Sequence, residues 1–537
     1  MVVAIVGGMH RRSIALTIVF ACGVLVPIAA CGGKQPAGYG ATGSSSGSGG
    51  SSSGGSGSGS GGVLGTGSSG SGVDAGYQCP AGLSCDVSCP NGTSTTLTGT
   101  VLDPAGKNPL YDVAVYVPVV ALQPLPRGVP TGADACSCPA LYQSGAITTT
   151  QTAVDGTFTL KNVPVGASVP LVLQIGKWRR LLHVAVTGCQ ANAQPAGSLT
   201  LPGSVPAGDT DDNMPDIAVS TGYADTLECL MIRMGVAASE YVGGAATTGH
   251  IHLFAGGESH TPANTLPGGA ETPATPGAPA SSTDLWSTQA QLMPYDITLL
   301  SCEGGETYDA NPPALEAYLN AGGRVFASHF QYSWFSGPFS SKQGYAAPAD
   351  WGTNLATWSN PDSSNYGPIG GVVDTTLNGS TAVFPKGQAL AQWLGVVSAL
   401  STGAKGVTTG DLPIYDPRYN AVVAATNKPA QPWITSDGSG SGAEAGQTMY
   451  FSFDTPVVPD PTVGPDGGGP SYCGRAVFSD LHVGGSYTTK DAPPAPGGCV
   501  TTDLSAQEKV LEFMLFDLSS CVVPDTIVPP PPNMPVQ

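Results

Sequence analysis

The sequence Tyr295-Asp-Ile-Thr-Leu-Leu300, followed by a helical pattern from Pro313 and then by Arg324-Val-Phe-Ala-Ser328, determines the fold class. Both flanking segments are short, continuous apolar runs, and between them Leu315 and Leu319 recur on one helical face. Strand, helix, strand with unbroken apolar runs is typical of a parallel sheet covered on both faces. We therefore expect an α/β domain with a mostly parallel sheet.

The same organisation extends over residues 217–524. Expected strands lie at 217–220, 250–254, 448–453 and 475–479, and helices begin near Leu227 and after Ser505, where Glu508 completes a capping box. The stretch of about 335–446 is rich in Gly, Pro and Asn and poorly periodic, apart from a helix at about 387–394. We interpret it as a loop-rich insertion over the sheet.

Residues 77–205 have a different period. Short alternating runs at 96–102, 114–118, 157–160 and 168–175 are separated by turn sequences such as Asp155-Gly156. This pattern is typical of an antiparallel sandwich. An acidic stretch, 206–216, links it to the α/β domain, and residues 525–537 form a Pro-rich tail.

The N-terminal segment is typical of an export signal. Arg11 and Arg12 precede a mostly apolar, charge-free stretch that ends at Ala30, directly before Cys31. An ordinary signal peptide with a chance Cys, or a single transmembrane anchor, are the alternatives. Residues 31–76 read as a disordered tether, since 27 of the 32 residues from Ala41 to Gly72 are Gly or Ser.

The segment that ends at Cys31 resembles the lipobox of bacterial lipoproteins, in which residues 1–30 are removed and the Cys is acylated. An acylated Cys31 would anchor the chain to a membrane without a spanning helix. Gly32 stands where enteric lipoproteins of the inner membrane have Asp, so the resemblance implies the outer membrane of a Gram-negative cell envelope.

Composition excludes several classes of function. Asp and Glu outnumber Lys and Arg by 38 to 19, giving a formal net charge of −19. With so few cations, binding to nucleic acid through phosphate contacts is excluded, as is a polybasic membrane surface. Thirteen Cys are typical of an exported, disulfide-bonded chain.

The order TLTGTVLDPAGKNPLYDVAVYV (96–117), then TAVDGTFTLKNVPVGASVPLVLQIG (152–176), resembles the carboxypeptidase regulatory-like domain, a transthyretin-like sandwich grouped with carbohydrate-binding-like folds. An insert at about 119–148 departs from that family. The resemblance implies an accessory module without catalytic residues. Trp178, inside the basic run Lys177–Arg180, is a candidate sugar-binding residue, with an ordinary strand Trp covering the sandwich as the alternative.

The runs YDITLLSCEGGE (295–306), ALEAYLNAGGRVFASHF (314–330) and GRAVFSDLHVGG (474–485) resemble the class I glutamine-amidotransferase-like fold, within its ThuA-like branch. True amidotransferases have a nucleophilic Cys where this chain has Ser328-His329. They also have a Glu two residues after the late His, where this chain has Gly484 after His482. The resemblance therefore implies the fold without glutamine hydrolysis.

His329 and His482 follow predicted strands, at the sheet edge where parallel α/β folds bind ligands. We consider them candidate acid/base residues with Asp480, which should share the strand face of His482. Tyr332 and Trp334 would offer stacking surface for a sugar. The alternative is an inherited pair of His side chains, satisfied by backbone partners and without a function.

Other clusters are weaker candidates. His250 and His252 have a spacing that suits a metal, but a paired polar edge is the alternative, and we predict neither a metal nor a cofactor. Asp209, Asp211 and Asn213 resemble only the start of a calcium loop, so a solvated linker is preferred. Cys473 and Cys499 are the expected disulfide around His482. An odd number of Cys leaves at least one thiol free or bonded to another chain, and Cys302 is the candidate for a reactive thiol, although Glu303 beside it would raise its pKa.

Together these features predict a multidomain, lipid-anchored cell-envelope protein: a disordered N-terminal part, a transthyretin-like β-sandwich and an α/β domain. We expect a binding or structural role, with a glycan or an envelope protein as partner and no nucleic acid. The alternative is a hydrolase on carbohydrate or amide substrates that uses His329 and His482.

Overall fold

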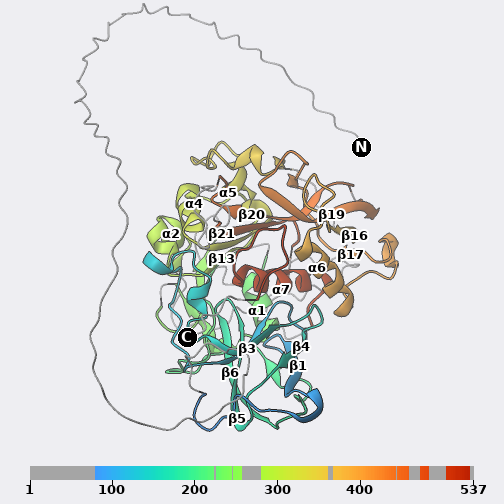
Figure 1. The fold of residues 1–537 in the computed structure, drawn as a ribbon. Helices are drawn as coiled ribbons and strands as arrows, with labels where there is room; N and C mark the ends of the chain where they lie inside the picture. The colour runs from blue at the N-terminus through green and yellow to red at the C-terminus, as the bar shows by residue number, and fades with distance from the viewer. Residues whose placement is uncertain are drawn as a thin grey trace, which may run out of the picture. The chain divides into compact units, whose positions relative to one another are not determined.

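A computed structural model describes residues 79–222, 225–244, 246–256, 280–360, 367–442, 444–458, 472–482 and 503–531. All of them belong to one compact unit, Asp74–Gln537, which is mixed α/β with many strands in several sheets and few helices (Figure 1). The predicted signal peptide, tether and lipidation site at Cys31 lie outside the described residues, as do His260 and Cys499. Within the described ranges, no helix combines the length and apolarity needed to cross a bilayer.

Two four-stranded sheets are formed by the N-terminal part of this unit. One has the order β4-β1-β7, with β8 also paired to β1, and the other the order β3-β2-β5-β6. Apolar side chains of both sheets, among them Leu97, Val115 and Leu171, lie in one buried cluster. The strands are β1 (Thr96–Leu102), β2 (Ala114–Pro118), β3 (Ala146–Gln151), β4 (Thr157–Lys161), β5 (Gly166–Ile175), β6 (Trp178–Val186), β7 (Ala191–Ala193) and β8 (Leu199–Thr200).

An eleven-stranded sheet forms the rest of the unit, with the order β10-β11-β9-β13-β14-β21-β20-β19-β16-β17 and β12 paired to β11. The pairings from β10 to β21 are parallel and those from β21 to β17 antiparallel. The strands are β9 (Ile217–Thr221), β10 (Tyr241–Gly243), β11 (Ile251–Ala255), β12 (Ala280–Ser281), β13 (Ile297–Leu300), β14 (Arg324–Ser328), β16 (Ile369–Val373), β17 (Leu412–Ile414), β19 (Ala430–Gly440), β20 (Thr448–Thr455) and β21 (Gly474–Ser479). β15 (Thr357–Trp358) and β18 (Ala421–Val422) form a separate pair.

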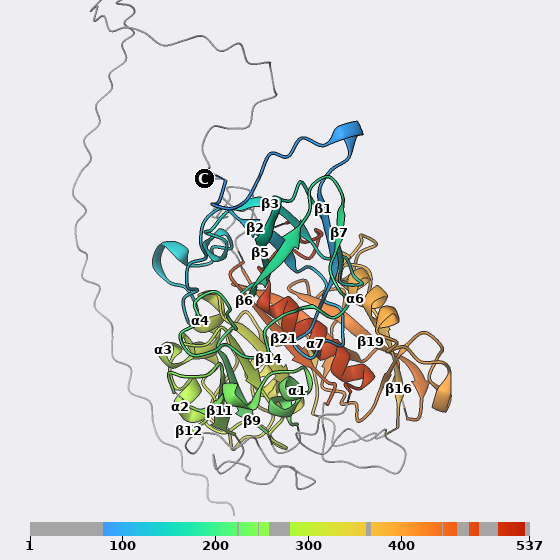
Figure 2. The same cartoon turned by 90° about the horizontal axis from the view of Figure 1, so that it is seen from below.

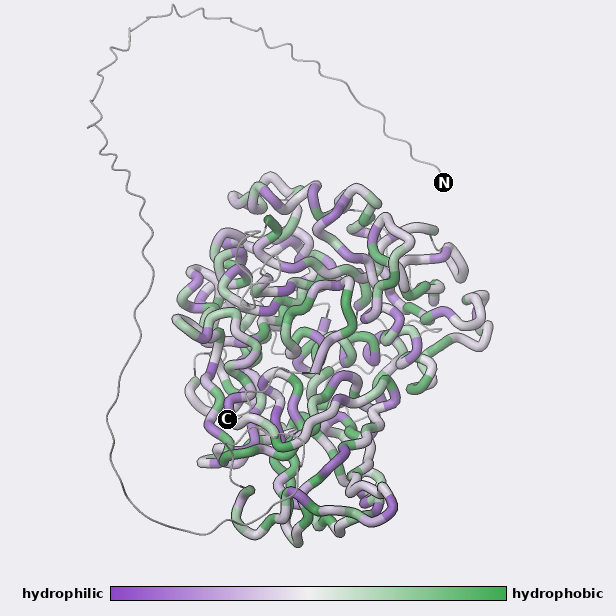
Figure 3. Tube along the Cα trace, viewed as in Figure 1, coloured by the Kyte–Doolittle hydropathy of each residue, from purple (hydrophilic) through white to green (hydrophobic). Residues whose placement is uncertain are grey.

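Both faces of the large sheet are covered, as the apolar runs predict. Along β14, Phe326 belongs to one buried cluster while Val325 and Ala327 belong to the other, because successive side chains of a strand point to opposite faces. The central strands carry much of the apolar sequence (Figure 3). The helices are α1 (Leu227–Arg233), α6 (Pro385–Val396) and α7 (Ala506–Ser519) on the first face, and α2 (Thr283–Trp286), α3 (Gln289–Leu292), α4 (Pro312–Asn320) and α5 (Ser333–Ser336) on the second.

Helix α7 lies between the small sheets and the large sheet (Figure 2). Its predicted capping box is present, and its apolar side chains are buried on several sides. Phe516 packs on Trp178 with ring centroids 5.6 Å apart, and Phe513 packs on Tyr111 at 6.1 Å. A Cβ at Gly176, in the turn from β5 to β6, would meet the carbonyl oxygen of Ser519 at 1.6 Å, so this close approach requires glycine.

The basic run that starts β6 is part of this packing and does not form an exposed edge. Trp178 is 3% exposed, Arg179 is 2% exposed, and Lys177 pairs with Asp296 at 2.6 Å. The predicted acidic linker pairs with the same strand, since Arg179 and Asn213 exchange two backbone hydrogen bonds of 3.0 and 2.8 Å. The core is therefore continuous across residues 206–216.

The segment 335–446 corrects the expectation of a loop-rich cover. It contains the expected helix, as α6. It also supplies β16, β17 and β19, which are most of the strands on the antiparallel side of the large sheet. Strand β16 has the sequence IGGVV, and a register shift lies between Ile369 and Gly371. Such a short, glycine-containing strand has no clear period from which it could be predicted.

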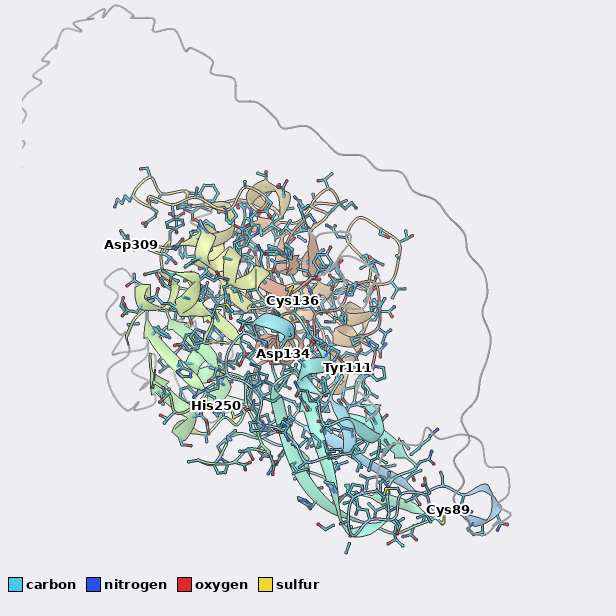
Figure 4. All side chains as sticks on the ribbon, turned by 60° about the vertical axis from the view of Figure 1, so that its left-hand side comes forward. Cys89, Tyr111, Asp134, Cys136, His250 and Asp309 are labelled. Atoms are coloured by element: carbon cyan, nitrogen blue, oxygen red, sulfur yellow. A yellow bond between two sulfur atoms is a disulfide. The ribbon has the colours of Figure 1, made fainter. Side chains whose placement is uncertain are left out.

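Disulfides join distant parts of the chain. Cys136 bonds Cys473 and Cys138 bonds Cys521, across 337 and 383 residues, while Cys79–Cys85 and Cys89–Cys189 stay within the N-terminal part. The predicted Cys473–Cys499 bridge is therefore wrong, because the insert at 119–148 brings Cys136 to Cys473. In Figure 4 Cys136 lies beside the large-sheet part, whereas Cys89 lies at the far end of the small sheets.

The two long-range disulfides constrain nearly the same loop, which predicts a non-additive loss of stability. Closing the whole loop is worth about 6 kcal/mol. Replacing either pair by Ser should lower the free energy of unfolding by only about 4 kcal/mol, because the remaining pair still closes most of the loop. Removing the second pair should cost more than removing the first.

Denaturant midpoints measured without reductant would test this. The control is Cys79→Ser with Cys85→Ser, a bridge over six residues, for which the same model gives about 2 kcal/mol. Equal costs for one pair and for both pairs would contradict the assignment.

Candidate functional site

Three side chains meet at the carboxyl edge of the parallel strands. Cys302 follows β13, His329 follows β14 and His482 follows β21, and these three strands are direct neighbours in the sheet. Because parallel strands end at the same edge, residues far apart in the sequence arrive at one place. All three are buried, with Cys302 0%, His329 6% and His482 1% exposed.

The backbone at His329 has an unusual conformation. Its φ is +48°, in the left-handed region that β-branched and bulky residues avoid, and the chain turns there from β14 into a short 3-10 helix, His329–Tyr332. Ser328 beside it is fully buried and donates its hydroxyl hydrogen bond to the carboxylate of Asp225. Strained residues of this kind cluster at functional sites, which makes the position notable.

A line of hydrogen-bond contacts connects four side chains. The Asp416 Oδ2 lies 3.0 Å from His482 Nδ1, His482 Nε2 lies 2.9 Å from His329 Nδ1, and His329 Nδ1 lies 3.2 Å from Cys302 Sγ. An ionised Asp416 can only accept, so His482 carries its proton on Nδ1 and presents the lone pair of Nε2 to His329. Asp416 is in turn held by Arg418, whose Nη1 lies 2.6 Å from Asp416 Oδ1.

Burial keeps the thiol and the two imidazoles neutral. It raises the pKa of Cys302 to about 12, although backbone hydrogen bonds from Phe330 and Gly304 oppose this. Burial, together with His482 and Arg418, lowers the pKa of His329 well below its usual value. Burial also lowers the pKa of His482, although the hydrogen bond that its ring donates to Asp416 opposes this. As it stands, the cluster contains no thiolate nucleophile.

Asp480 does not take the role that its sequence position predicts. Its Oδ2 accepts the backbone N–H groups of Asn420 at 2.8 Å and Ala421 at 3.3 Å, and burial raises its pKa to about 8. The alternation that should place it beside His482 fails because β21 ends at Ser479. The carboxylate that orients His482 is Asp416.

The predicted stacking surface is also corrected. Tyr332 and Trp334 are fully buried in the core, where Trp334 packs edge-on against Trp286 at 5.1 Å and donates its indole N–H to Gln331. The Tyr332 hydroxyl donates to Glu306 at 2.8 Å. Trp178 is buried as well, so none of the three predicted sugar-binding aromatics is on the surface.

The other histidine and aspartate candidates have structural partners. His250 Nδ1 lies 2.6 Å from Glu240, and His252 lies among Asp216, the carbonyl oxygen of Gly244 and Arg127. Asp209 accepts the backbone N–H groups of Asp211 and Asp212, which is a local turn. Among the described residues, the group that could hold a metal is instead Cys302, His329 and His482, whose ligand atoms all lie within 4.8 Å of one another.

Sequence reasoning identified His329 and His482 as a pair and Cys302 separately as the free thiol. The structure leaves Cys302 free, but burial, not Glu303, is the main cause of its raised pKa. Asp416 and Arg418 were missed because they follow β17, inside the segment read as loops. The signal was the sequence Tyr415-Asp-Pro-Arg-Tyr-Asn420, which places a carboxylate and a guanidinium between two apolar strands.

Comparison of the chain with protein-family models, curated proteins and solved structures finds no match in any of the three.

The pKa and burial of Cys302 predict an unreactive thiol in the folded protein. With a pKa of about 12, its thiolate fraction at pH 8 is about a thousandfold below that of an ordinary cysteine. In the presence of a chelator, alkylation of the Cys302 peptide, followed by mass spectrometry, should be at least that much slower in the native chain than in denaturant without reductant. Rapid native labelling would contradict the buried, protonated state.

Proposed function

We propose that this chain is an exported, lipid-anchored protein of the cell envelope, whose compact unit has a binding or structural role and no hydrolytic activity. The observation that carries the proposal is the set of disulfides that joins distant parts of the chain. Such bonds form and persist in oxidising compartments, outside the cytosol. The positive, apolar and small-residue order that ends at Cys31 supports acylation as the means of attachment.

We also propose the finer fold. The two small sheets would form a transthyretin-like sandwich that acts as an accessory module, and the large sheet an amidotransferase-like domain. The shared buried cluster of the small sheets supports the first assignment, and the parallel order β9-β13-β14-β21 supports the second.

The absence of hydrolysis is supported by the state of the cluster. Hydrolysis by a cysteine needs a thiolate that a substrate can reach, and Cys302 is buried and protonated. Our proposed partner is a cell-wall glycan or another envelope protein, held by surface contacts, since the aromatics that suggested a sugar pocket are in the core.

An enzyme remains the second candidate, and one observation favours it. Cys302, His329, His482 and Asp416 lie in the order of nucleophile, base and carboxylate: His329 Nδ1 could take the thiol proton of Cys302 while it passes its own proton to His482 Nε2, and Asp416 would balance the resulting imidazolium. Such an enzyme would act on carbohydrate or amide substrates once the edge of the sheet opened.

The anchoring proposal is tested by a pair of cysteine variants in the full chain. Cys31→Ser should abolish incorporation of a fatty-acid analogue and release the protein from the membrane fraction, whereas Cys22→Ser, in the segment that is removed, should leave both unchanged. Labelling that survives Cys31→Ser would overturn acylation at this residue.

The choice between binding and hydrolysis is tested with insoluble peptidoglycan. We expect the chain to sediment with it and to release no soluble fragments. A His329→Ala, His482→Ala double variant should sediment equally, because the cluster is buried. Fragment release by the wild type that is lost in the double variant would favour the enzyme.

A further inference from the structure

The geometry points to a transition-metal site of the zinc class, in which Cys302 Sγ, His329 Nδ1 and His482 Nε2 are the ligands and Asp416 orients His482. This site is independent of the proposed envelope role, and it differs from the histidine pair that the sequence suggested.

The donor set fits zinc and not the harder cations. One thiol sulfur and two imidazole nitrogens are ligands that Zn²⁺ and related ions prefer, whereas Mg²⁺ and Ca²⁺ take oxygen ligands. Among the described residues, the cluster contains no carboxylate within the group. Three protein ligands leave a fourth tetrahedral position for water, as in zinc sites that are not closed structural sites.

The distances between the three atoms are close to those around a tetrahedral ion. Tetrahedral zinc, with bonds of about 2.0–2.1 Å to nitrogen and about 2.3 Å to sulfur, would place two nitrogens about 3.3 Å apart and nitrogen and sulfur about 3.6 Å apart. The corresponding distances are 2.9 Å between the imidazoles and 3.2 Å between His329 and Cys302. These two contacts would each lengthen by about 0.4 Å, and Cys302 Sγ and His482 Nε2, which lie within 4.8 Å of each other, would come to about 3.6 Å around the ion.

The positions of the protons on the two imidazoles also support this site. The hydrogen bond that His482 Nδ1 donates to Asp416 leaves the lone pair of His482 Nε2 facing His329. A proton on His329 Nδ1 is donated to that lone pair. His329 Nδ1 then has no lone pair that could accept a hydrogen bond from the thiol of Cys302. A divalent ion bound there would release the thiol proton of Cys302 and shift the proton of His329 from Nδ1 to Nε2, so that all three atoms present a lone pair to the ion.

The contacts behind the ligands are those of metal sites. A metal-bound histidine commonly donates its second ring N–H to a carboxylate, which fixes the tautomer and the orientation of the ring. Asp416 accepts this hydrogen bond from His482. Arg418 holds Asp416, and the side-chain amide of Gln507 donates to the carbonyl oxygen of His482. The ring of His329 packs on that of Phe330, with centroids 4.1 Å apart.

The test uses the full chain, purified without reductant, loaded with zinc and dialysed. Elemental analysis should find about one zinc per chain. Cys302→Ser and His482→Ala should each reduce this to less than about a tenth, whereas His183→Ala, which removes an exposed imidazole of β6, should retain it. Circular dichroism melts of each variant in chelator show whether the fold is intact.

Two further measurements keep the proposal falsifiable if a ligand variant does not fold. Cobalt bound to the wild type should show a thiolate-to-metal charge-transfer band and a tetrahedral visible spectrum. Asp416→Asn should bind zinc about 10- to 100-fold more weakly, while Asp437→Asn, an exposed carboxylate on β19, should not.

Three outcomes would overturn the site: a folded wild type that holds no stoichiometric zinc, zinc that survives both ligand variants, or a cobalt complex without the thiolate band.

Discussion

The burial of α7 on all sides is the constraint on which the rest of the unit depends. A helix in this position needs buried partners for its polar side chains, and those of α7 come from three directions. Glu508 pairs with Arg233 of α1, Glu512 accepts from Asn108 beside the small sheets, and Asp517 bonds Lys386 of α6 and Arg475 of β21. Removing Arg233 from the pair with Glu508, or Lys386 from the pair with Asp517, would weaken the compensation of a buried charge, which costs several kcal/mol.

This packing also explains why the site is closed. With α1, α6 and α7 on one face and the aromatic cluster of Trp286, Trp334 and Phe335 on the other, the ends of β13, β14 and β21 lie inside the unit. The same enclosure removes water from the thiol and the imidazoles, and this is the cause of their shifted pKa values. A site of this kind is suited to holding an ion more than to turning over a large substrate.

Much of the fold follows from short-range pattern. The strand Arg324–Ser328 and the capped helix after Ser505 were predictable, because a continuous apolar run and a capping box are local signals. The strands β16 and β19 were not, because glycine and proline obscure their period and their pairing is set by long-range contacts. The continuity of the core through Trp178 also depends on long-range contacts. The sequence alone does not show whether a Trp is exposed or buried.

The site was predictable in part. His329 and His482 could be brought together from the rule that parallel strands end at one edge, but the neighbouring position of Cys302 required the strand order β13-β14-β21. Asp416 could not be found in this way, since it comes from the opposite half of the sheet. The error over Asp480 came from extending strand alternation beyond Ser479, where the strand had ended.

The described residues between 79 and 531 lie in one compact unit, and we expect them to unfold cooperatively around α7. Native-state hydrogen exchange on the oxidised full chain tests it most directly. The account predicts that the slowest amides of β5 and β6 and those of β13 and β14 exchange with the same opening free energy, since both would require global unfolding. A distinctly lower opening free energy for β5 and β6 would show that the small sheets unfold by themselves, and would contradict it.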